Sequence, residues 1–138
     1  TEHRTQEEDI FFSYSVCNDL EALEGLLGTS SDAMKLINRK DERDDSALAL
    51  ACMEGHRDVV GLLHKRGADI ESFDMQGRTP LMEALYHEHG TIAEYLVSEG
   101  ASTYVKDEEG TSILDVARST LNKLEHMEWM LSRLETET

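Results

Sequence analysis

The apolar residues of the chain fall into short blocks with helical spacing, and polar turns separate the blocks. The first block holds Ile10, Phe11, Tyr14 and Cys17 at that spacing. Asn18 and Asp19 interrupt it, and a second block covers residues 20–27. Further pairs of blocks cover residues 48–63 and 81–97. We therefore predict pairs of short helices, each of which needs a neighbour to bury its apolar face.

The blocks repeat with a fixed step along the chain. Asp41, Asp74 and Asp107 are spaced by about 33 residues, a period typical of stacked helical repeats. The same step relates several other sets, namely Leu48, Leu81 and Leu114; Ala51, Ala84 and Ala117; Gly67 and Gly100; Ala68 and Ala101; His56 and His89. Agreement in this many columns indicates copies of one structural unit.

The segment from Asp74 to Ala84, DMQGRTPLMEA, resembles the opening of an ankyrin repeat, whose family pattern is D-x-x-G-x-T-P-L-H-x-A. Gly77 suits the positive φ of a tight turn. Thr79 suits the N-cap of a helix, and Pro80 suits its first position. The resemblance implies an all-α solenoid of stacked helix-turn-helix units with short β-hairpin loops.

The resemblance covers about residues 8–135 and implies four repeats. The expected division is a flexible tail at 1–7, an N-terminal capping repeat at 8–38, repeats at 39–71 and 72–104, and a C-terminal capping repeat at 105–138. The first repeat lacks the hairpin, and residues 29–38 allow an extra helical turn. After Ala117 the resemblance fades, but a cap helix is still expected from the spacing of Leu121, Leu124, Met127, Met130, Leu131 and Leu134.

Local features carry further expectations. Asp44 stands where the family prefers glycine, and we expect it in the left-handed region. Ser112 and Asp115 have the spacing of a capping box. Gly67 and Gly100 suit the ends of second helices. His56 and His89 occupy the family's histidine column, where the ring braces the turn.

The net charge of −16, from 29 acidic and 13 basic residues, argues against direct nucleic-acid binding and favours a basic or neutral partner. Solubility alone is the other explanation of this charge. No apolar run is long enough to span a membrane, and no secretory signal opens the chain. Cys17 and Cys52 fall in predicted helices, and we interpret them as reduced, buried thiols. We expect an intracellular protein of the cytoplasm or nucleus, a monomer or an excised part of a larger chain.

The sequence offers no constellation for catalysis or for a cofactor. His87, Glu88 and His89 are adjacent and do not share one helix face, so they do not predict a metal site. Phosphate loops and nucleophile elbows are missing from the sequence. The acids fall on expected surface positions, where carboxylates are solvated. We therefore predict a non-enzymatic protein with no cofactor.

The resemblance places the binding surface on the hairpin tips and on the exposed side of the first helices, which line a concave groove. The tips read acidic (Asp41, Glu42, Asp44 and Asp45, beside Arg43), then mixed (Phe73, Met75, Gln76 and Arg78), then acidic (Asp107, Glu108 and Glu109). The groove columns hold Met53, Glu54, Tyr86, His87, Ser119 and Thr120, with Glu83 and Asp115 nearby. The expected partner is a basic protein or peptide with an apolar centre. Ordinary solvated turns are the other explanation of the acidic tips.

Phe73 is the most informative of these residues, because its column holds Lys40 and Lys106 in the neighbouring repeats. It is either an exposed binding anchor or a residue that packs across the hairpin on the next tip. A second hypothesis for function is a chromatin reader that holds a methylated lysine among Phe73, Tyr86 and Tyr104. Trp129, the single tryptophan, lies in the diverged cap. A purely structural spacer is a third.

Overall fold

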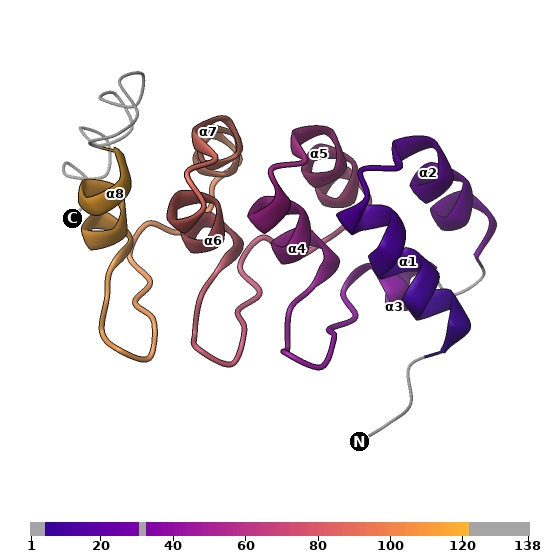
Figure 1. Ribbon diagram of the computed structural model, residues 1–138, viewed down its shortest axis with the longest axis horizontal. Coiled ribbons are helices and arrows are strands. Elements are labelled where there is room, and N and C mark those ends of the chain that lie inside the picture. Colours follow the sequence, from indigo (N-terminus) through magenta and orange to yellow (C-terminus); the bar gives the residue numbers. More distant parts are fainter. Residues whose placement is uncertain (1–4, 31–32, 122–138) are drawn as a thin grey trace.

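A computed structural model describes residues 5–30 and 33–121 of the chain (Figure 1). The elements in this part are α1 (Gln6–Val16), α2 (Leu20–Thr29), α3 (Ala33–Ile37), α4 (Ala47–Glu54), α5 (Arg57–Lys65), α6 (Pro80–Tyr86), α7 (Gly90–Ser98) and α8 (Ile113–Leu121). Helices α1, α4, α6 and α8 stack in one layer, and α2, α5 and α7 stack in a second (Figure 1). The predicted all-α solenoid of stacked helix pairs is confirmed.

The predicted turn and cap chemistry starts the first helices. The Met82 amide donates to the Thr79 hydroxyl (3.4 Å), and Pro80 opens α6. The Ser112 hydroxyl accepts from the Asp115 amide, and the Asp115 carboxylate accepts from the Ser112 amide, each at 3.1 Å. This reciprocal pair is the predicted capping box, which satisfies amides that the helix itself leaves free.

Three hairpin loops project from the same side of the stack (Figure 1). We call residues 41–45, 74–78 and 107–111 tip two, tip three and tip four. Each opens with an aspartate whose Oδ1 accepts two amides of its own tip, such as Asp74 from Gln76 (2.8 Å) and Arg78 (3.0 Å). Asp44 and Gly77 take positive φ values of 65° and 76°, as predicted. The repeated aspartate is therefore a structural residue of the tip.

Neighbouring units share one apolar core. Leu48 and Leu81 are almost completely buried, and Leu114 is partly buried against the same core. Each unit also braces the one before it through its histidine. His56 Nε2 donates to the Val16 carbonyl (2.7 Å), and His89 Nε2 donates to the Met53 carbonyl (3.0 Å). The histidine column is thus structural, as expected, and links one repeat to the next.

The first helix corrects two expectations. Helix α1 already begins at Gln6, inside the predicted tail, because Thr5 caps it. Cys17 is exposed at the C-cap of α1 and is not the buried thiol that we expected, whereas Cys52 is buried. The buried positions of α1 are Glu8, Phe11, Phe12 and Ser15. The buried face of α1 therefore differs from the predicted face, and its two polar residues, Glu8 and Ser15, are hydrogen-bonded.

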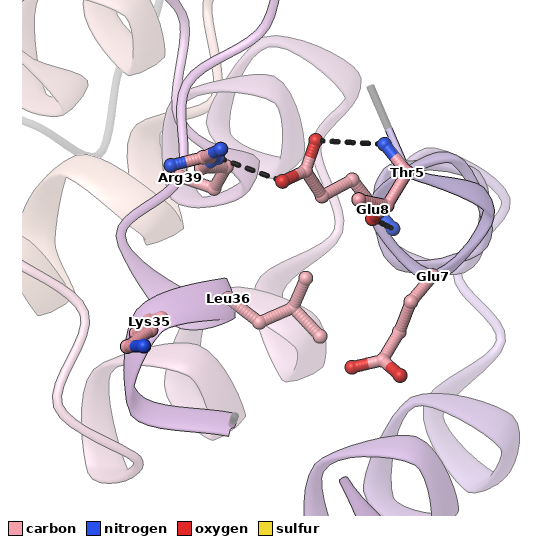
Figure 2. A pocket seen from close by; sticks show the side chains of 6 residues that line it. All are labelled: Thr5, Glu7, Glu8, Lys35, Leu36 and Arg39. Atoms are coloured by element: carbon pink, nitrogen blue, oxygen red, sulfur yellow. Dashed lines mark hydrogen bonds and ion pairs between the residues drawn. The ribbon is translucent and has the colours of Figure 1, made fainter. Parts of the chain in front are cut away.

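Glu8 shows how this buried face is stabilised (Figure 2). Its Oε2 accepts from the Thr5 amide (3.2 Å), and its Oε1 accepts from Arg39 Nε (2.7 Å). The Ser15 hydroxyl donates to the Phe11 carbonyl (2.9 Å). A buried polar group that is hydrogen-bonded loses little by leaving water.

Several predictions are not tested by the described residues. The predicted cap residues Leu124, Met127, Met130, Leu131 and Leu134, together with Trp129, lie outside them, as do residues 1–4. The extra turn expected within residues 29–38 is present as α3. The bounds of the four repeats stay a prediction.

Gly55→Ala should test the brace between repeats. Gly55 has φ +80°, and a Cβ there would lie 2.6 Å from Cε1 of the His89 ring. Gly110→Ala is the matched control, because Gly110 has φ +82° with no heavy atom within 4 Å of such a Cβ. Both variants should lose about 1–2 kcal/mol of unfolding free energy from backbone strain. Gly55→Ala should lose roughly 1 kcal/mol more, because the His89 hydrogen bond is displaced. Urea unfolding measures both, and equal losses would contradict the proposed brace.

Candidate functional site

The three tips form one continuous edge. The Lys40 ammonium donates to the Phe73 carbonyl (2.6 Å), which ties the start of tip two to tip three. The Glu108 amide donates to the Gln76 carbonyl (2.9 Å), which ties tip four to tip three. The tips therefore lie side by side in the order expected from the sequence (Figure 1).

Tip two offers fewer exposed acids than we predicted. Asp41 accepts amides of its own tip, and a carboxylate oxygen of Asp44 lies 3.4 Å from the Lys40 ammonium. Asp45 is only 5% exposed, so its placement among solvated tip acids was wrong. Glu42 and Arg43 remain exposed on this tip. On tip four Asp107 is buried in the same structural role, and Glu108 and Glu109 are exposed.

Tip three, together with Phe73 directly before it, carries the apolar part of the edge. Phe73 is 59% exposed and Met75 is 61% exposed. The Lys40 ammonium lies 5.3 Å from the Phe73 ring centroid, on the side of the preceding tip. Most of the ring remains open to solvent, which agrees with the exposed-anchor alternative. Gln76 is exposed beside it.

The other two predicted aromatic residues, Tyr86 and Tyr104, differ from each other in burial. Tyr86 is partly buried, and the Arg78 guanidinium carbon lies 4.3 Å from its ring centroid. Tyr104 is 64% exposed. Of the predicted groove residues, Glu54 and Ser119 are exposed, while Thr120 is buried and donates to the Val116 carbonyl (2.9 Å).

A pocket of about 380 Å³ lies where tips two and three meet α4 and α6. It brings together seven of the predicted binding residues, namely Arg43, Asp45, Met53, Met75, Gln76, Arg78 and His87. Asp74 and Glu83, which we had not assigned to the binding surface, also line it. We call this cavity the tip pocket.

Two buried carboxyl groups distinguish the tip pocket. Asp45 and Glu83 are 5% and 3% exposed. Glu83 Oε2 lies 3.5 Å from His87 Nε2, and Glu83 Oε1 lies 3.9 Å from Arg78 Nη1. Asp45 Oδ1 is buried and has no hydrogen-bond partner. An unpaired buried carboxylate oxygen is costly in a folded protein, so its presence needs an explanation.

Burial also changes the acidity of both groups. Burial raises the pKa of Asp45 to about 6, and the nearby Asp41 and Asp74 carboxylates add to the shift. Burial raises the pKa of Glu83 to about 7, against the opposing charge of Arg78. A hydrogen bond from protonated Glu83 to the Asp74 carboxylate adds to the shift. The expectation that all acids are solvated was therefore wrong at these two positions.

The sequence carried a signal for Glu83 that we did not use. One repeat step before and after it stand Leu50 and Val116, so this column is apolar in the neighbouring units. An acid in a buried apolar column is a departure that the scaffold does not require.

Two other cavities are less suited to a ligand. A cavity of about 330 Å³ lies between α1 and α3, but its glutamate Glu8 is already satisfied by Thr5 and Arg39 (Figure 2). A wider cavity lies along α5 and α7, where Arg57 covers the Tyr95 ring at 3.9 Å and His64 Nδ1 is 2.9 Å from the Tyr95 hydroxyl. Among the described residues no cluster of three potential metal ligands is found, and no helix is long and apolar enough to cross a membrane.

Comparison with known proteins gives consistent matches. A family model of ankyrin repeats, in three copies, matches residues 12–107. Human Ankyrin repeat domain-containing protein 63 is 44% identical over 61 residues, which cover 44% of this chain and 16% of that protein. Mouse Ankyrin repeat and SAM domain-containing protein 6 is 33% identical over 117 residues (84% and 13%). Tyrosine-protein kinase HTK16 of Hydra vulgaris is 30% identical over 70 residues (51% and 9%). The chain thus spans only a small part of the length of these relatives.

Glu83→Gln should make the stability of the protein less dependent on pH. The folded state holds the Glu83 proton up to a pKa of about 7, whereas the ordinary value is 4.5. The resulting stabilisation is therefore present below pH 4.5 and is lost as pH rises through 7. Wild type should lose on the order of 1–3 kcal/mol more unfolding free energy than the variant over this range. Urea unfolding across the range measures the difference.

Glu21→Gln is the matched control, because Glu21 is exposed on α2. Its pH profile should parallel that of wild type. A Glu83→Gln profile that also parallels wild type would show that Glu83 is ionised in the folded state at neutral pH.

Proposed function

Because this chain belongs to the ankyrin-repeat family, a family of protein-interaction modules that is generally non-enzymatic, we propose that it docks a basic segment of a partner protein. The segment would lie along the three tips and enter the concave side between tips two and three. The observation that carries the proposal is the edge itself, where exposed Phe73 and Met75 stand between exposed acids of the two flanking tips.

The charges of the edge support a basic partner. Glu42 is exposed on tip two, Glu108 and Glu109 are exposed on tip four, and Asp45 and Glu83 line the pocket between tips two and three. Arg43 and Arg78 offset part of this charge. A cationic segment would be attracted over a long range and held in register by such an arrangement. The apolar centre on tip three would supply the anchor contact.

The chromatin-reader hypothesis is weaker on the same geometry. A methylated lysine needs open aromatic faces around one point. The Arg78 guanidinium already covers Tyr86, and the Lys40 ammonium lies over Phe73. These internal cations compete with any cationic guest for the ring faces.

The proposal includes an intracellular setting, in the cytoplasm or nucleus. Cys17 and Cys52 are both free thiols, and Cys17 is exposed to solvent. An exposed free thiol is typical of a reducing compartment.

Charge reversal on the tips should weaken binding of a basic peptide. Peptides selected from a random display library on wild type should be enriched in lysine and arginine around an apolar residue. Glu42→Lys with Glu108→Lys and Glu109→Lys should then bind them roughly tenfold more weakly, with a shallower salt dependence, because charges at an interface rim act mainly on association. Titration by fluorescence anisotropy at two salt concentrations measures both quantities.

The matched control carries the same change in net charge away from the tips. Glu21→Lys with Glu24→Lys and Glu99→Lys alters exposed acids of α2 and the C-terminus of α7. It should bind as wild type does. If both triple variants bind the peptide equally weakly, the effect comes from net charge and not from the tips. If the selected peptides lack basic residues, the basic-partner proposal is wrong.

A further inference from the structure

The tip pocket contains a buried acceptor that the protein itself does not satisfy. Asp45 is 5% exposed, its Oδ1 has no hydrogen-bond partner, and it lines a cavity of about 380 Å³. The hairpin does not require this carboxyl group, because Asp45 pairs within tip two through its backbone amide and carbonyl. One repeat step later the same column holds Arg78, and a further step later it holds Thr111.

The two arginines of the pocket leave Asp45 Oδ1 unpaired. The Arg78 guanidinium carbon lies 4.3 Å from the Tyr86 ring centroid, its Nη1 lies 3.9 Å from Glu83 Oε1, and its buried Nε has no hydrogen-bond partner. Arg43 is exposed, and its charge favours the ionised form of Asp45. Neither arginine donates to Asp45 Oδ1, so this oxygen is available to a donor from another molecule.

We propose that the tip pocket is a socket for one lysine or arginine side chain of the partner, with its charged head on Asp45 Oδ1 and its aliphatic stem against Met53 and Met75. This inference rests on the proposed function and specifies how the basic segment is held. Met53 and Met75 line the same cavity as the carboxyl groups. Lysine and arginine match this combination, because each buries an apolar stem while its head is charged.

Other ligand classes fit less well. An anion would meet Asp45, Asp74 and Glu83 within the same cavity. A purely apolar side chain would leave the Asp45 oxygen buried and unpaired, which is unfavourable. A cation supplies both the missing donor and the opposite charge.

The socket also predicts how binding depends on pH. The charged or titratable groups around Asp45 and Glu83 are Asp41, Asp44, Asp74, Arg43, Arg78, His87 and the Cys52 thiol. An inserted cation stabilises the ionised carboxylates and so lowers their pKa values. Binding therefore releases protons, and affinity rises with pH through the range in which Asp45 and Glu83 titrate.

Small side-chain mimics test the socket without a known partner. n-Butylammonium chloride and n-butylguanidinium chloride would be titrated into the protein, and the methionine methyl signals followed by NMR. Met53 and Met75 should shift and saturate in the millimolar range, whereas Met34, which is 74% exposed on α3, serves as an internal reference. The two salts show whether the socket favours an ammonium or a guanidinium. n-Pentanol controls for shape, and sodium chloride controls for ionic strength.

Conservative substitutions show which carboxyl group binds the mimic. Asp45→Asn should weaken binding of the mimic at least tenfold. It should keep the fold, because Asp45 Oδ1 has no hydrogen bond that asparagine would break, and urea unfolding checks this. Glu83→Gln should weaken binding less than Asp45→Asn does, and it should reduce the rise of affinity with pH. Asp58→Asn, an exposed acid of α5, should match wild type. Shifts that stay linear, that sodium chloride reproduces, or that persist in Asp45→Asn would overturn the socket.

The socket and the proposed function fail in different ways. The triple charge reversal on Glu42, Glu108 and Glu109 leaves the pocket intact, so Met53 and Met75 should still respond to the mimics. Loss of peptide binding in that variant with no methyl response in wild type would reject the socket and keep the basic partner on the tips alone. A methyl response without any basic peptide in the selection would retain the socket and reject the docked segment.

Discussion

The interface between successive helix pairs is the interaction on which the rest of the structure depends. Each first helix packs on the first helix of the neighbouring unit, and Leu48 and Leu81 are buried there with almost no exposure. The His89 ring adds a directional bond to the Met53 carbonyl of the preceding unit. Apolar contact supplies most of the stability, and the histidine bond fixes the register between units. Because the register is fixed, the tips are presented side by side as one edge.

Equivalent positions of successive repeats have similar surroundings, so a residue that differs in type from its equivalents is informative. Leu50 and Val116 show that the Glu83 column is apolar in the neighbouring repeats, and a carboxyl group there is buried at a cost. Asp45 is a second departure, since its Oδ1 has no partner. The two departures meet in one cavity, although 38 residues separate them in sequence by their numbering. Their coincidence in space carries more weight than either residue alone.

The features that the sequence predicted well are those decided locally or by repetition. Thr79, Gly77 and the pair Ser112–Asp115 take their conformations from turn and cap chemistry within a few residues. The lysine-bearing column marked Phe73 as unusual but left its exposure open, and the structure shows it 59% exposed. The failures concern buried polar residues, whose partners are distant in sequence. Glu8 is buried because Arg39, many residues later, pairs with it, and no local pattern indicates that.

The burial of Asp45 was the feature hardest to predict from its position in the repeat. Assigning it to a solvated tip was reasonable, because the tip begins at Asp41 and the family places turns there. The chain enters α4 immediately afterwards, with Ser46 as the N-cap, so residue 45 already faces the interior. The large negative charge of −16 is explained by exposed acids that keep the protein soluble. Asp45 and Glu83 contribute little to that effect because they are buried. The net charge and the buried pair are therefore separate features, and the proposed cation socket concerns the second.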